Sequence, residues 1–490
     1  MSFVETQLFI GGEPRAASGG ATYAVHNPAR LSEQVGAAAA ASIADVEQAI
    51  AAASGAFKSW SSKSVEERAD ALLRVADVLS QDEDDIDARK RLLTREHGKV
   101  LFEADIEIRR IADRFRQVSN FAAEIANTPK RSSPQFDTLV TRKARGVSTL
   151  IVPWNWPLAI LGAKLPQALL AGNTVVVKLA NFSPLATAQT VSKIAAALPP
   201  GVVNLVTGDG VLLGDTLTGH PDVKQVNFTG SVRVGKMVMA QAAQNLTPVT
   251  LELGGNDAGI LLDDVDLSGN AFQRLFLATF LTTGQICMAM KRMYVHRSRF
   301  EEVVEGFTAF LNDMQVGDGL EEGVRMGPVN NRRQYDVVRR IRDEAQAAGA
   351  DLRAVGQMQA DENVEETFFL RPYLAINADP SLSVVHEEQF GPILPIVPFD
   401  TEEEALAMAN DSEFGLSSSV WSADNERAVS VARQIEAGFT NINSHGPTAM
   451  DGLSPFGGVK NSGLGRNFGI EGVMQFQEYH SISGPTGSLG

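Results

Sequence analysis

The chain contains one cysteine, Cys287, which follows Gly284-Gln285-Ile286 where the helical pattern from residue 271 ends. A thiolate is a strong nucleophile, so a cysteine in this setting could attack a carbonyl carbon and form a covalent intermediate. The alternative is a small buried hydrophobic side chain, the commoner role of an unpaired cysteine. One thiol excludes an intrachain disulfide and no histidines have ligand spacing, so we predict no metal site.

A carboxylate that could act as a base lies in the segment Leu251-Glu-Leu-Gly-Gly-Asn256. The apolar residues on both sides of Glu252 would raise its pKa towards the range of a useful base. The two glycines that follow leave open space beside it. The alternative is a glutamate at the end of a strand that points to solvent.

An amide that could stabilise an oxyanion lies in Pro153-Trp-Asn-Trp-Pro157. Because two prolines restrict the backbone around Asn155, its side chain is held rather than free. A rigidly presented amide could donate a hydrogen bond to a developing negative charge. The alternative is that Asn155 caps a helix that starts at Pro157.

The segment Phe228-Thr-Gly-Ser-Val-Arg-Val-Gly235 predicts a strand that turns into a helix. Its two glycines would let the backbone approach a phosphate, and the start of the helix supplies N–H donors. The segment matches neither the G-x-G-x-x-G fingerprint nor a P-loop, and a plain tight turn explains it about as well.

These residues are far apart in the sequence, so a fold must bring them together. From residue 146 onward, short β-branched runs alternate with helical patterns, which predicts a parallel sheet with helices on both faces. Such sheets bind ligands beyond the carboxyl ends of their strands. The predicted strands are 147–152, 174–178, 202–206, 225–229 and 249–253, with helices that begin near residues 157, 184, 211 and 231.

The first quarter of the chain has a helical pattern. Ser64-Val-Glu-Glu67 predicts a capping box and a helix to about residue 91, and a second helix is predicted over 101–126. The alanine-rich stretch 36–57 predicts an exposed helix. The polar, alternating stretch 127–141 predicts a hairpin arm, and a further alternating α/β region covers 256–455.

The 490 residues carry a net charge of −16, from 59 acidic and 43 basic side chains. So negative a surface disfavours nucleic acid and anionic lipid as partners. The first residues lack a basic, apolar leader and no stretch is apolar enough to span a bilayer. We therefore expect a cytoplasmic protein with neither a nucleic-acid nor a membrane partner.

Taken together, the four segments resemble the aldehyde dehydrogenase superfamily in their order and spacing. The resemblance continues through Glu387-Glu-Gln-Phe-Gly-Pro392, Asn441-Ile-Asn443 and Pro455-Phe-Gly-Gly-Val-Lys-Asn-Ser-Gly-Leu-Gly-Arg466, and it covers essentially the whole chain. It implies an α/β fold with a Rossmann-like parallel-sheet cofactor domain (1–126 and 145–254), a second α/β catalytic domain (255–455), and a small β oligomerisation arm with a C-terminal tail (127–144 and 456–490). It also implies a homodimer or homotetramer.

The resemblance implies specific catalytic roles. Cys287 attacks the aldehyde carbonyl, and the side-chain amide of Asn155 with the Cys287 backbone N–H stabilises the thiohemiacetal oxyanion. After hydride leaves for the nicotinamide, Glu252 activates the water that hydrolyses the thioester. Two rival functions stay open: a CoA-acylating dehydrogenase, in which CoA takes the acyl group, and a non-catalytic binding or structural relative.

The resemblance also implies a cofactor site for NAD or NADP, with NAD favoured. Lys178 and Ser231 resemble the residues that hold the adenosine ribose and pyrophosphate, Glu388 resembles the carboxylate that holds the nicotinamide ribose, and Phe390 packs near that ring. Where members with a firm NAD preference have a glutamate, this chain has Asn181, which removes a repulsion of the NADP 2′-phosphate and leaves NADP open. The predicted cofactor residues are completed by Trp154, Phe228, Gly230, Gly235 and Leu253.

Two further departures from the family pattern are Thr282 in place of the usual asparagine and Asn467 in place of a common glutamate. We expect Asn467 to weaken a proton relay around Lys164. The substrate tunnel is expected from segments 156–163, 280–288 and 445–453, which contribute no arginine or lysine at the predicted lining, so we predict a neutral, apolar or aromatic aldehyde. His445 is also explained as an ordinary loop histidine. The predicted lining is Trp156, Ile160, Leu281, Ile286, Met288, His445, Met450 and Leu453.

Overall fold

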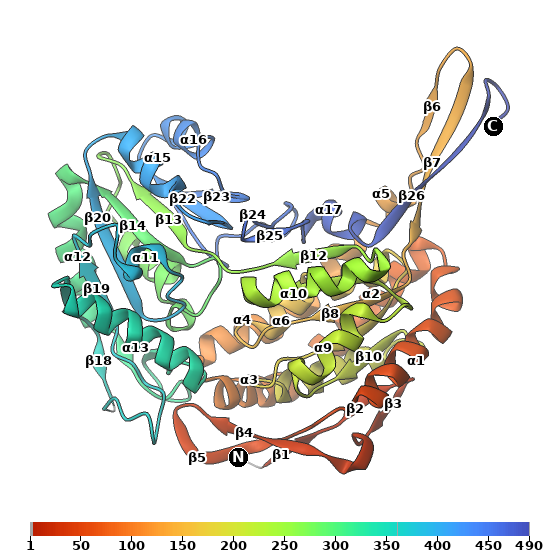
Figure 1. Ribbon diagram of the computed structural model, residues 1–490, viewed down its shortest axis with the longest axis horizontal. Coiled ribbons are helices and arrows are strands. Elements are labelled where there is room, and N and C mark those ends of the chain that lie inside the picture. The colour runs from red at the N-terminus through yellow and green to blue at the C-terminus, as the bar shows by residue number, and fades with distance from the viewer. Residues whose placement is uncertain (1–2, 360, 490) are drawn as a thin grey trace.

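The computed structural model describes residues 3–359 and 361–489, which form two α/β lobes and a projecting arm (Figure 1). The first lobe contains an eight-stranded sheet whose five central strands are parallel. In order across the sheet these are β12 (Val249–Glu252), β11 (Val223–Thr229), β8 (Val147–Ile151), β9 (Thr174–Lys178) and β10 (Val203–Val206). The predicted strands are confirmed to within two residues at each end. Antiparallel strands complete the two edges, namely β25 (Gly463–Leu464) beside β12, and β2 (Leu8–Ile10) followed by β3 (Glu13–Arg15) beside β10.

The order of these strands reverses at β8. The chain builds β9 and β10 on one side of β8 and then returns to build β11 and β12 on the other. Ligands of parallel sheets bind beyond the carboxyl ends of the strands at such a reversal. Asn155 follows β8 and Ser231 follows β11, so both lie at this point in the sheet.

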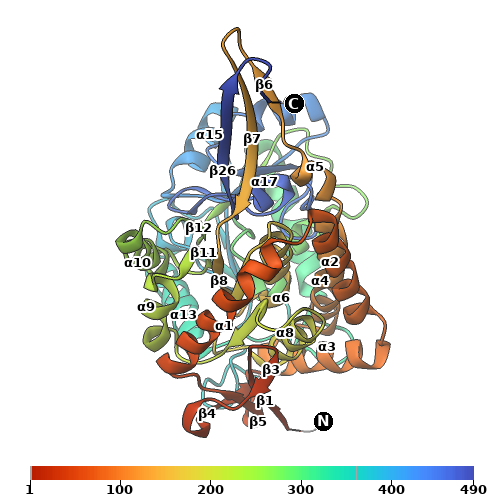
Figure 2. The same ribbon diagram turned by 90° about the vertical axis from the view of Figure 1, so that its right-hand side faces the viewer.

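Helices cover both faces of the first sheet (Figures 1 and 2). They are α1 (Ile43–Ser61), α2 (Val65–Ser80), α3 (Glu83–His97), α4 (Leu101–Ser119), α5 (Ala122–Ala126), α6 (Pro157–Gly162), α7 (Leu165–Leu170), α8 (Leu185–Ala196), α9 (Gly210–Gly219) and α10 (Val232–Ala242). The predicted capping box is confirmed at the start of α2, where the Ser64 Oγ accepts from the Glu67 N–H at 3.1 Å and the Glu67 carboxylate accepts from the Ser64 N–H at 2.7 Å.

The prediction for the first quarter is wrong in four respects. Residues 4–39 form strands, including β1 (Val4–Thr6), β4 (Thr22–Asn27) and β5 (Arg30–Ala39), because β5 pairs with both β1 and β4. The helix expected over 64–91 is interrupted because Asp82 caps a new helix, and the one expected over 101–126 is interrupted after Ser119. Helix α1 is amphipathic rather than exposed, since the face that carries Val46, Ala49, Ile50 and Ala53 is buried.

The second lobe contains a seven-stranded sheet with largely parallel pairing. Its strands in spatial order are β17 (Asp351–Ala354), β19 (Tyr373–Ile376), β20 (Ile393–Phe399), β14 (Met290–His296), β13 (Asp257–Leu261), β22 (Ser417–Trp421) and β23 (Phe439–Ile442). Its helices are α11 (Ala271–Thr279), α12 (Phe300–Asn312), α13 (Arg332–Ala347), α14 (Ser383–His386), α15 (Glu402–Asn410) and α16 (Asn425–Ala432). Small additional sheets are formed by β15 (Gln315–Val316), β16 (Val324–Met326) and β18 (Gln357–Met358), and by β21 (Phe414–Gly415) and β24 (Val459–Lys460).

The predicted hairpin is confirmed as part of an antiparallel arm that projects from the first lobe (Figure 2). Its strands are β6 (Lys130–Ser132), β7 (Phe136–Ala144) and β26 (Gln477–Pro485), and β26 follows the short helix α17 (Gly469–Met474). The C-terminal strand therefore pairs with a segment that lies more than three hundred residues earlier.

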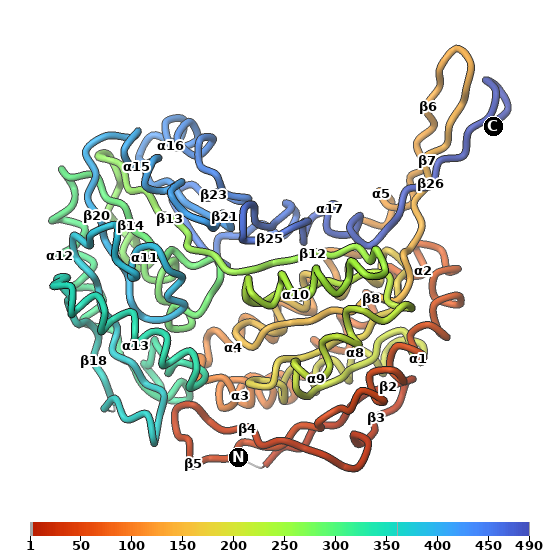
Figure 3. The backbone as a smooth tube through the Cα atoms, viewed as in Figure 1, coloured from red at the N-terminus to blue at the C-terminus, as the bar shows by residue number. Residues whose placement is uncertain are grey.

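The chain passes from β12 directly into β13, so the loop after Glu252 joins the two lobes (Figure 3). The loop after Glu252 thus connects a strand of the first sheet with a strand of the second, and the candidate site lies at this junction of the two lobes. In the part of the chain that the structure describes, no helix is both long and apolar enough to cross a bilayer.

Candidate active site

A largely apolar cavity collects the three residues that were predicted to carry chemistry. Asn155 comes from the loop after β8, Glu252 from the end of β12, and Cys287 from the loop before β14. The complete lining is Asn155, Trp156, Ala159, Ile160, Ala163, Thr229, Glu252, Ile286, Cys287, Met288, Pro447, Met450, Phe456, Asn467 and Phe468.

Cys287 is an unpaired, partly exposed cysteine rather than a sealed core residue. Its backbone carbonyl accepts a hydrogen bond from the Lys291 Nζ at 2.6 Å, and the same ammonium donates to the Ile286 carbonyl at 2.8 Å. Burial raises the pKa of the thiol to about 12; Lys291 opposes this rise, and the carboxyl groups of Glu252 and Glu388 add to it. At rest the sulfur is therefore protonated and must lose its proton before it can attack.

Glu252 is buried, so the alternative of a solvent-facing glutamate is wrong. Burial raises its pKa to about 8, while the charges of Lys164 and Arg466 and a hydrogen bond from Asn467 act in the opposite direction. Its Oε1 has no hydrogen-bond partner among the residues that the structure describes, and a Cβ added to Gly457 would lie 2.8 Å from that oxygen. Glycine at this position therefore makes room for the buried carboxyl group of Glu252.

Asn155 does not cap helix α6, so that alternative is also wrong. The residue at the N-cap position is Trp156, which makes no side-chain cap, and the first free N–H groups of α6 donate to Glu107 instead. The Asn155 Nδ2 donates to the Gln285 carbonyl at 2.9 Å, in the loop that leads to Cys287. An amide nitrogen carries two N–H groups, so this bond uses one and leaves the other for the cavity.

A series of hydrogen-bonded polar side chains lies beside Glu252. The Lys164 ammonium contacts the Asn227 Oδ1, and the Asn227 Nδ2 donates to the Asn467 Oδ1 at 3.0 Å. Burial lowers the pKa of Lys164 to about 7, and the negative charge of Glu252 raises it in part. Asn467 therefore takes part in these hydrogen bonds, but its amide cannot take up a proton, and the weakening of a relay stays a prediction.

The predicted cofactor residues fall into two groups. Lys178 is buried at the end of β9 with its Nζ beside the start of α9, and Ser231 is the N-cap of α10. At the other end, the Glu388 carboxylate accepts from the Gly255 N–H at 3.0 Å and lies 3.7 Å from Lys291, which places it against the loop of the nucleophile. The Trp154 and Phe390 rings meet edge to face with centroids 5.7 Å apart.

The glycines of the strand-to-helix turn serve packing between side chains in this structure. A Cβ on Gly230 would lie 2.5 Å from the Phe228 ring, and one on Gly235 would lie 2.5 Å from the Leu253 side chain. Neither glycine has a positive φ, so a tight left-handed turn does not explain them. The two glycines and the two large side chains fit together as one surface at the start of α10.

Five of the predicted tunnel residues line the cavity, and three do not. Leu281 packs inside the adjoining hydrophobic cluster, and Leu453 is 58% exposed on the surface. His445 is fully buried, with its Nδ1 2.9 Å from the Ser419 Oγ and its Nε2 3.9 Å from Asp257. Sequence reasoning missed Phe456 and Phe468, although Phe456 lies within a family motif, and an isolated bridge between Phe456 and Asn467 brings the neighbouring Phe468 to the same wall.

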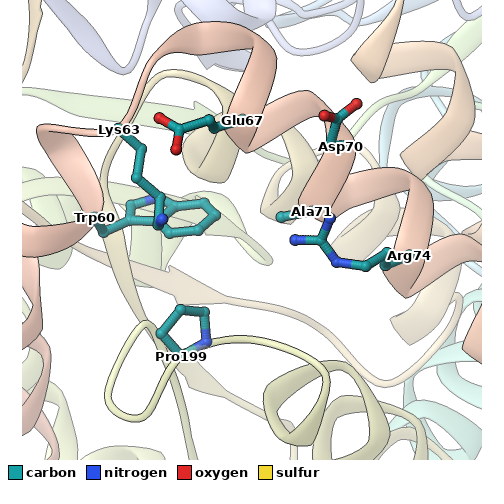
Figure 4. A pocket seen from close by; sticks show the side chains of 7 residues that line it. All are labelled: Trp60, Lys63, Glu67, Asp70, Ala71, Arg74 and Pro199. Atoms are coloured by element: carbon teal, nitrogen blue, oxygen red, sulfur yellow. The ribbon is translucent and has the colours of Figure 1, made fainter.

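A second concave site lies on the first lobe, away from these residues (Figure 4). Its lining is Trp60, Lys63, Glu67, Asp70, Ala71, Arg74 and Pro199. The Glu67 carboxylate already serves the α2 capping box, and the Trp60 N–H donates to the Leu169 carbonyl at 3.2 Å. This site contains none of the motif residues, and we assign no chemistry to it.

Thr282 is in a left-handed conformation, with φ +54°, and its hydroxyl accepts from the Trp156 Nε1 at 2.9 Å. A left-handed conformation costs roughly 1–2 kcal/mol for most side chains, and asparagine tolerates it better than a β-branched residue. Thr282→Asn should therefore raise the free energy of unfolding by up to about 1 kcal/mol and keep an acceptor for Trp156. Urea unfolding measures this, with Thr282→Ala, which removes the acceptor, as a destabilised control. An asparagine variant less stable than the wild type would contradict the argument.

The chain is similar to known proteins in both sequence and structure. The sequence model of the family described as "Aldehyde dehydrogenase family" matches residues 15–482. The 3-sulfolactaldehyde dehydrogenase of Pseudomonas putida is 36% identical, over 97% of both chains. Among solved structures, an NAD-dependent aldehyde dehydrogenase from Sinorhizobium meliloti superposes with a TM-score of 0.93 at 30% identity, covering 99% of this chain and 96% of that one. A betaine aldehyde dehydrogenase from Staphylococcus aureus in complex with NAD+ gives 0.91 at 31% identity, covering 99% and 95%.

Proposed function

Because this chain belongs to the aldehyde dehydrogenase family and oxidises an aldehyde to the carboxylic acid, we propose that Cys287, Glu252 and Asn155 carry out that reaction. One observation supports the assignment above the others. The three side chains come from separate segments, and they line one cavity between the two lobes. A protein that only binds ligands or serves as a scaffold has no need for a thiol, a base and an amide donor in one place.

In the first half of the reaction, the Cys287 thiol loses its proton to Glu252, the titratable base of the same cavity. The sulfur then forms a bond to the aldehyde carbon, and the carbonyl oxygen becomes an oxyanion. The free N–H of the Asn155 amide and the backbone N–H of Cys287 donate to this oxygen. Donors held in place before the reaction stabilise such a charge without reorganisation. The product of this attack is a thiohemiacetal on Cys287.

The second half releases the acid. As the carbonyl re-forms, the former aldehyde hydrogen departs as hydride, and a thioester remains on Cys287. After the proton from the thiol has passed from Glu252 to solvent, Glu252 takes a proton from a water molecule that attacks the thioester carbon. The carbon–sulfur bond breaks and the carboxylic acid leaves. The thiolate that is released takes the proton from Glu252, which restores the resting thiol. A covalent intermediate thus divides one difficult step into two easier ones.

A nicotinamide dinucleotide supplies the hydride acceptor when it is bound. The residues of this chain fit such a group, because they offer unmatched polar atoms where a ribose would lie. The Asn181 Oδ1 is buried and has no partner in the described part of the chain, and the Lys178 Nζ lies beside the start of α9. Lys178 and Asn181 would hold the adenosine ribose, the N–H groups at the start of α10 would hold a phosphate, and Glu388 would hold the second ribose. The NAD+ complex of the Staphylococcus aureus relative supports NAD for this chain.

The charge of the side chain at position 181 should affect the preference between NAD and NADP, and Asn181 is neutral. We expect Asn181→Glu to weaken NADP binding by about 10-fold or more, because the new carboxylate would repel the 2′-phosphate, with a smaller effect on NAD. Titration calorimetry with each dinucleotide measures the two dissociation constants. Asn181→Gln, which adds the same length without charge, is the matched control. Equal effects of the glutamate on both cofactors would contradict the assignment of this position.

The cavity favours a neutral, apolar or aromatic aldehyde. Apart from Asn155, Thr229, Glu252, Cys287 and Asn467, its lining side chains are apolar or aromatic, and it contains no arginine or lysine. We expect kcat/KM for benzaldehyde to exceed that for succinate semialdehyde by roughly 10-fold or more, since a carboxylate would be desolvated there without a partner. A panel of the two aldehydes with NAD measures this. A higher kcat/KM for succinate semialdehyde would refute the substrate class.

The main rival is a CoA-acylating dehydrogenase, in which CoA takes the acyl group from Cys287. A buried glutamate in the cavity favours water, because acyl transfer to CoA needs no hydrolytic base. The test is product analysis after incubation with benzaldehyde and NAD, with and without CoA. We expect benzoic acid in equal yield in both samples. Product that forms only when CoA is present would overturn the proposal.

The proposed domain limits follow the two sheets. Residues 1–126 and 145–254 contain the first sheet apart from its β25 edge, and 255–455 contain the second. We further propose that the arm of 127–144 and 456–490 joins copies of the chain into a homodimer or homotetramer. A three-stranded sheet that projects from the body and leaves β6 and β26 as its edges supports this role.

A further inference from the structure

Three buried charged residues near the start of α4 have no part in the steps described above. Lys99 precedes the helix, and Glu103 and Glu107 lie one turn apart on it. Their exposed fractions are 2%, 1% and 0%. Burying a charge costs several kcal/mol unless partners compensate, so the contacts of these side chains show what they hold in place.

Lys99 binds the backbone of the proposed oxyanion donor. Its Nζ lies 2.5 Å from the Glu107 Oε2 and donates to the Asn155 carbonyl at 2.8 Å. The same ammonium lies 4.4 Å from the centre of the Trp156 ring. The Lys99 ammonium thus contacts the Asn155 backbone, the Trp156 ring and the Glu107 carboxylate.

Glu107 holds the other side of the same loop. Its Oε1 accepts from the Leu158 N–H at 2.7 Å and from the Ala159 N–H at 3.2 Å, in the first turn of α6. Glu107 therefore forms an ion pair with Lys99 and also accepts hydrogen bonds from the backbone that follows the Asn155 loop. The loop with Asn155 is tied to α4 on both sides.

Glu103 ties the loop of the nucleophile to the same helix. Its carboxylate accepts from the Thr282 N–H at 2.5 Å and from the Val100 N–H at 3.1 Å. The two loops are also joined to each other, by the bond from Trp156 to Thr282 and by the bond from the Asn155 amide to Gln285, each 2.9 Å.

We propose that Lys99, Glu103 and Glu107 are positioning residues that hold the Asn155 loop and the Cys287 loop at the separation which the oxyanion requires. This inference rests on the proposed roles of Asn155 and Cys287. None of the three lines the cavity, so they act through the loops and do not touch the substrate. A displacement of about 1 Å at a reacting centre can cost on the order of 10²-fold in rate, which gives such a scaffold a measurable effect.

The test removes the pair as a unit, so that no buried charge is left alone. Lys99→Met combined with Glu107→Gln should lower kcat by about 10- to 100-fold with KM for the aldehyde nearly unchanged. Alkylation of Cys287 by iodoacetamide forms no oxyanion and should keep its rate. The matched control is Arg109→Met with Glu83→Gln, an exposed pair at 2.7 Å that joins α4 to the start of α3, which should leave kcat unchanged. A pair variant with wild-type kcat, or one that loses kcat and alkylation together, would overturn the inference.

Combination with Asn155→Ala separates this inference from the function it rests on. Loss of one oxyanion donor should cost on the order of 10²- to 10³-fold in kcat. In that background the Lys99/Glu107 pair should add little, because the amide it positions is gone. Multiplied losses would overturn the positioning role alone. Wild-type kcat in Asn155→Ala would overturn the proposed oxyanion donor and the positioning role together.

Glu107→Gln alone provides a second variant in case the double replacement does not fold. It is nearly isosteric and keeps an oxygen to accept from Leu158, but it removes the negative charge that holds Lys99. We expect a kcat lower by about 10-fold, with an unchanged KM and alkylation rate. Wild-type kcat in a folded Glu107→Gln protein would contradict the proposal.

Discussion

Replacement of Cys287 by alanine should lower kcat for aldehyde oxidation by on the order of 10⁴-fold or more, because no other side chain in the cavity can form the covalent intermediate. Dinucleotide binding should stay close to that of the wild type, since the residues proposed to hold the cofactor are elsewhere. Stopped-flow absorbance at the nicotinamide band measures kcat, and titration calorimetry measures the dissociation constant of the dinucleotide.

The single cysteine makes the result of this experiment unambiguous, because no other thiol can react. Any covalent adduct on a thiol must be on Cys287, because the chain has no other cysteine, so intact-mass spectrometry shows whether a thiol adduct has formed. Cys287→Ser is the matched control, because it keeps the size of the side chain and offers a poorer nucleophile. Dehydrogenase activity in Cys287→Ala that is comparable with the wild type would mean that the nucleophile is wrongly assigned.

Glu252→Gln should lower kcat by on the order of 10²- to 10⁴-fold, because the water and the thiol would both lose their proton acceptor. The pH profile gives a second signature. Burial raises the pKa of Glu252 to about 8, so the carboxylate form that accepts protons is populated above that pH and lost below it. In the wild type, kcat should rise with pH through about 8, and Glu252→Gln should lack this limb.

A second buried acid provides the control for that profile. Burial raises the pKa of Asp257 to about 7, and its side chain lies close behind the Cys287 loop without lining the cavity. Asp257→Asn should keep the rising limb at its wild-type position. If the limb disappeared in Asp257→Asn and persisted in Glu252→Gln, the base would be wrongly assigned.

Local patterns in the sequence predicted the elements whose stability is local. The strands of the first sheet are runs of β-branched residues that are buried on both faces, as in Thr174–Lys178, so composition alone marks them. The capping box at Ser64 and the hairpin arm depend on neighbours within a few residues. Most strands among the first forty residues pair with one another, but one of those that were missed, β2, also pairs with β10, almost two hundred residues later. A pattern within the segment cannot reveal such a partner.

The lining of the cavity shows the same limit at the level of single residues. Ile286 and Met288 were predicted from their place beside the nucleophile, and both line the cavity. Leu281, His445 and Leu453 lie in equally plausible segments, but packing turns the first two into the interior and leaves the third at the surface. Which way a side chain in a loop points depends on contacts with other elements, and those contacts are not encoded nearby.

The sequence by itself determined the kind of chemistry, since one thiol, one glutamate before two glycines and one asparagine between prolines are the groups that such an oxidation needs. Only the tertiary structure decided their protonation and their spacing. The same burial that brings Cys287 and Glu252 to one cavity raises the pKa of both. The loops that carry Asn155 and Cys287 meet through a hydrogen bond between residues 130 positions apart, and buried charges on α4 hold them. Desolvation and long-range packing arise when the chain closes on itself, and no local segment contains them.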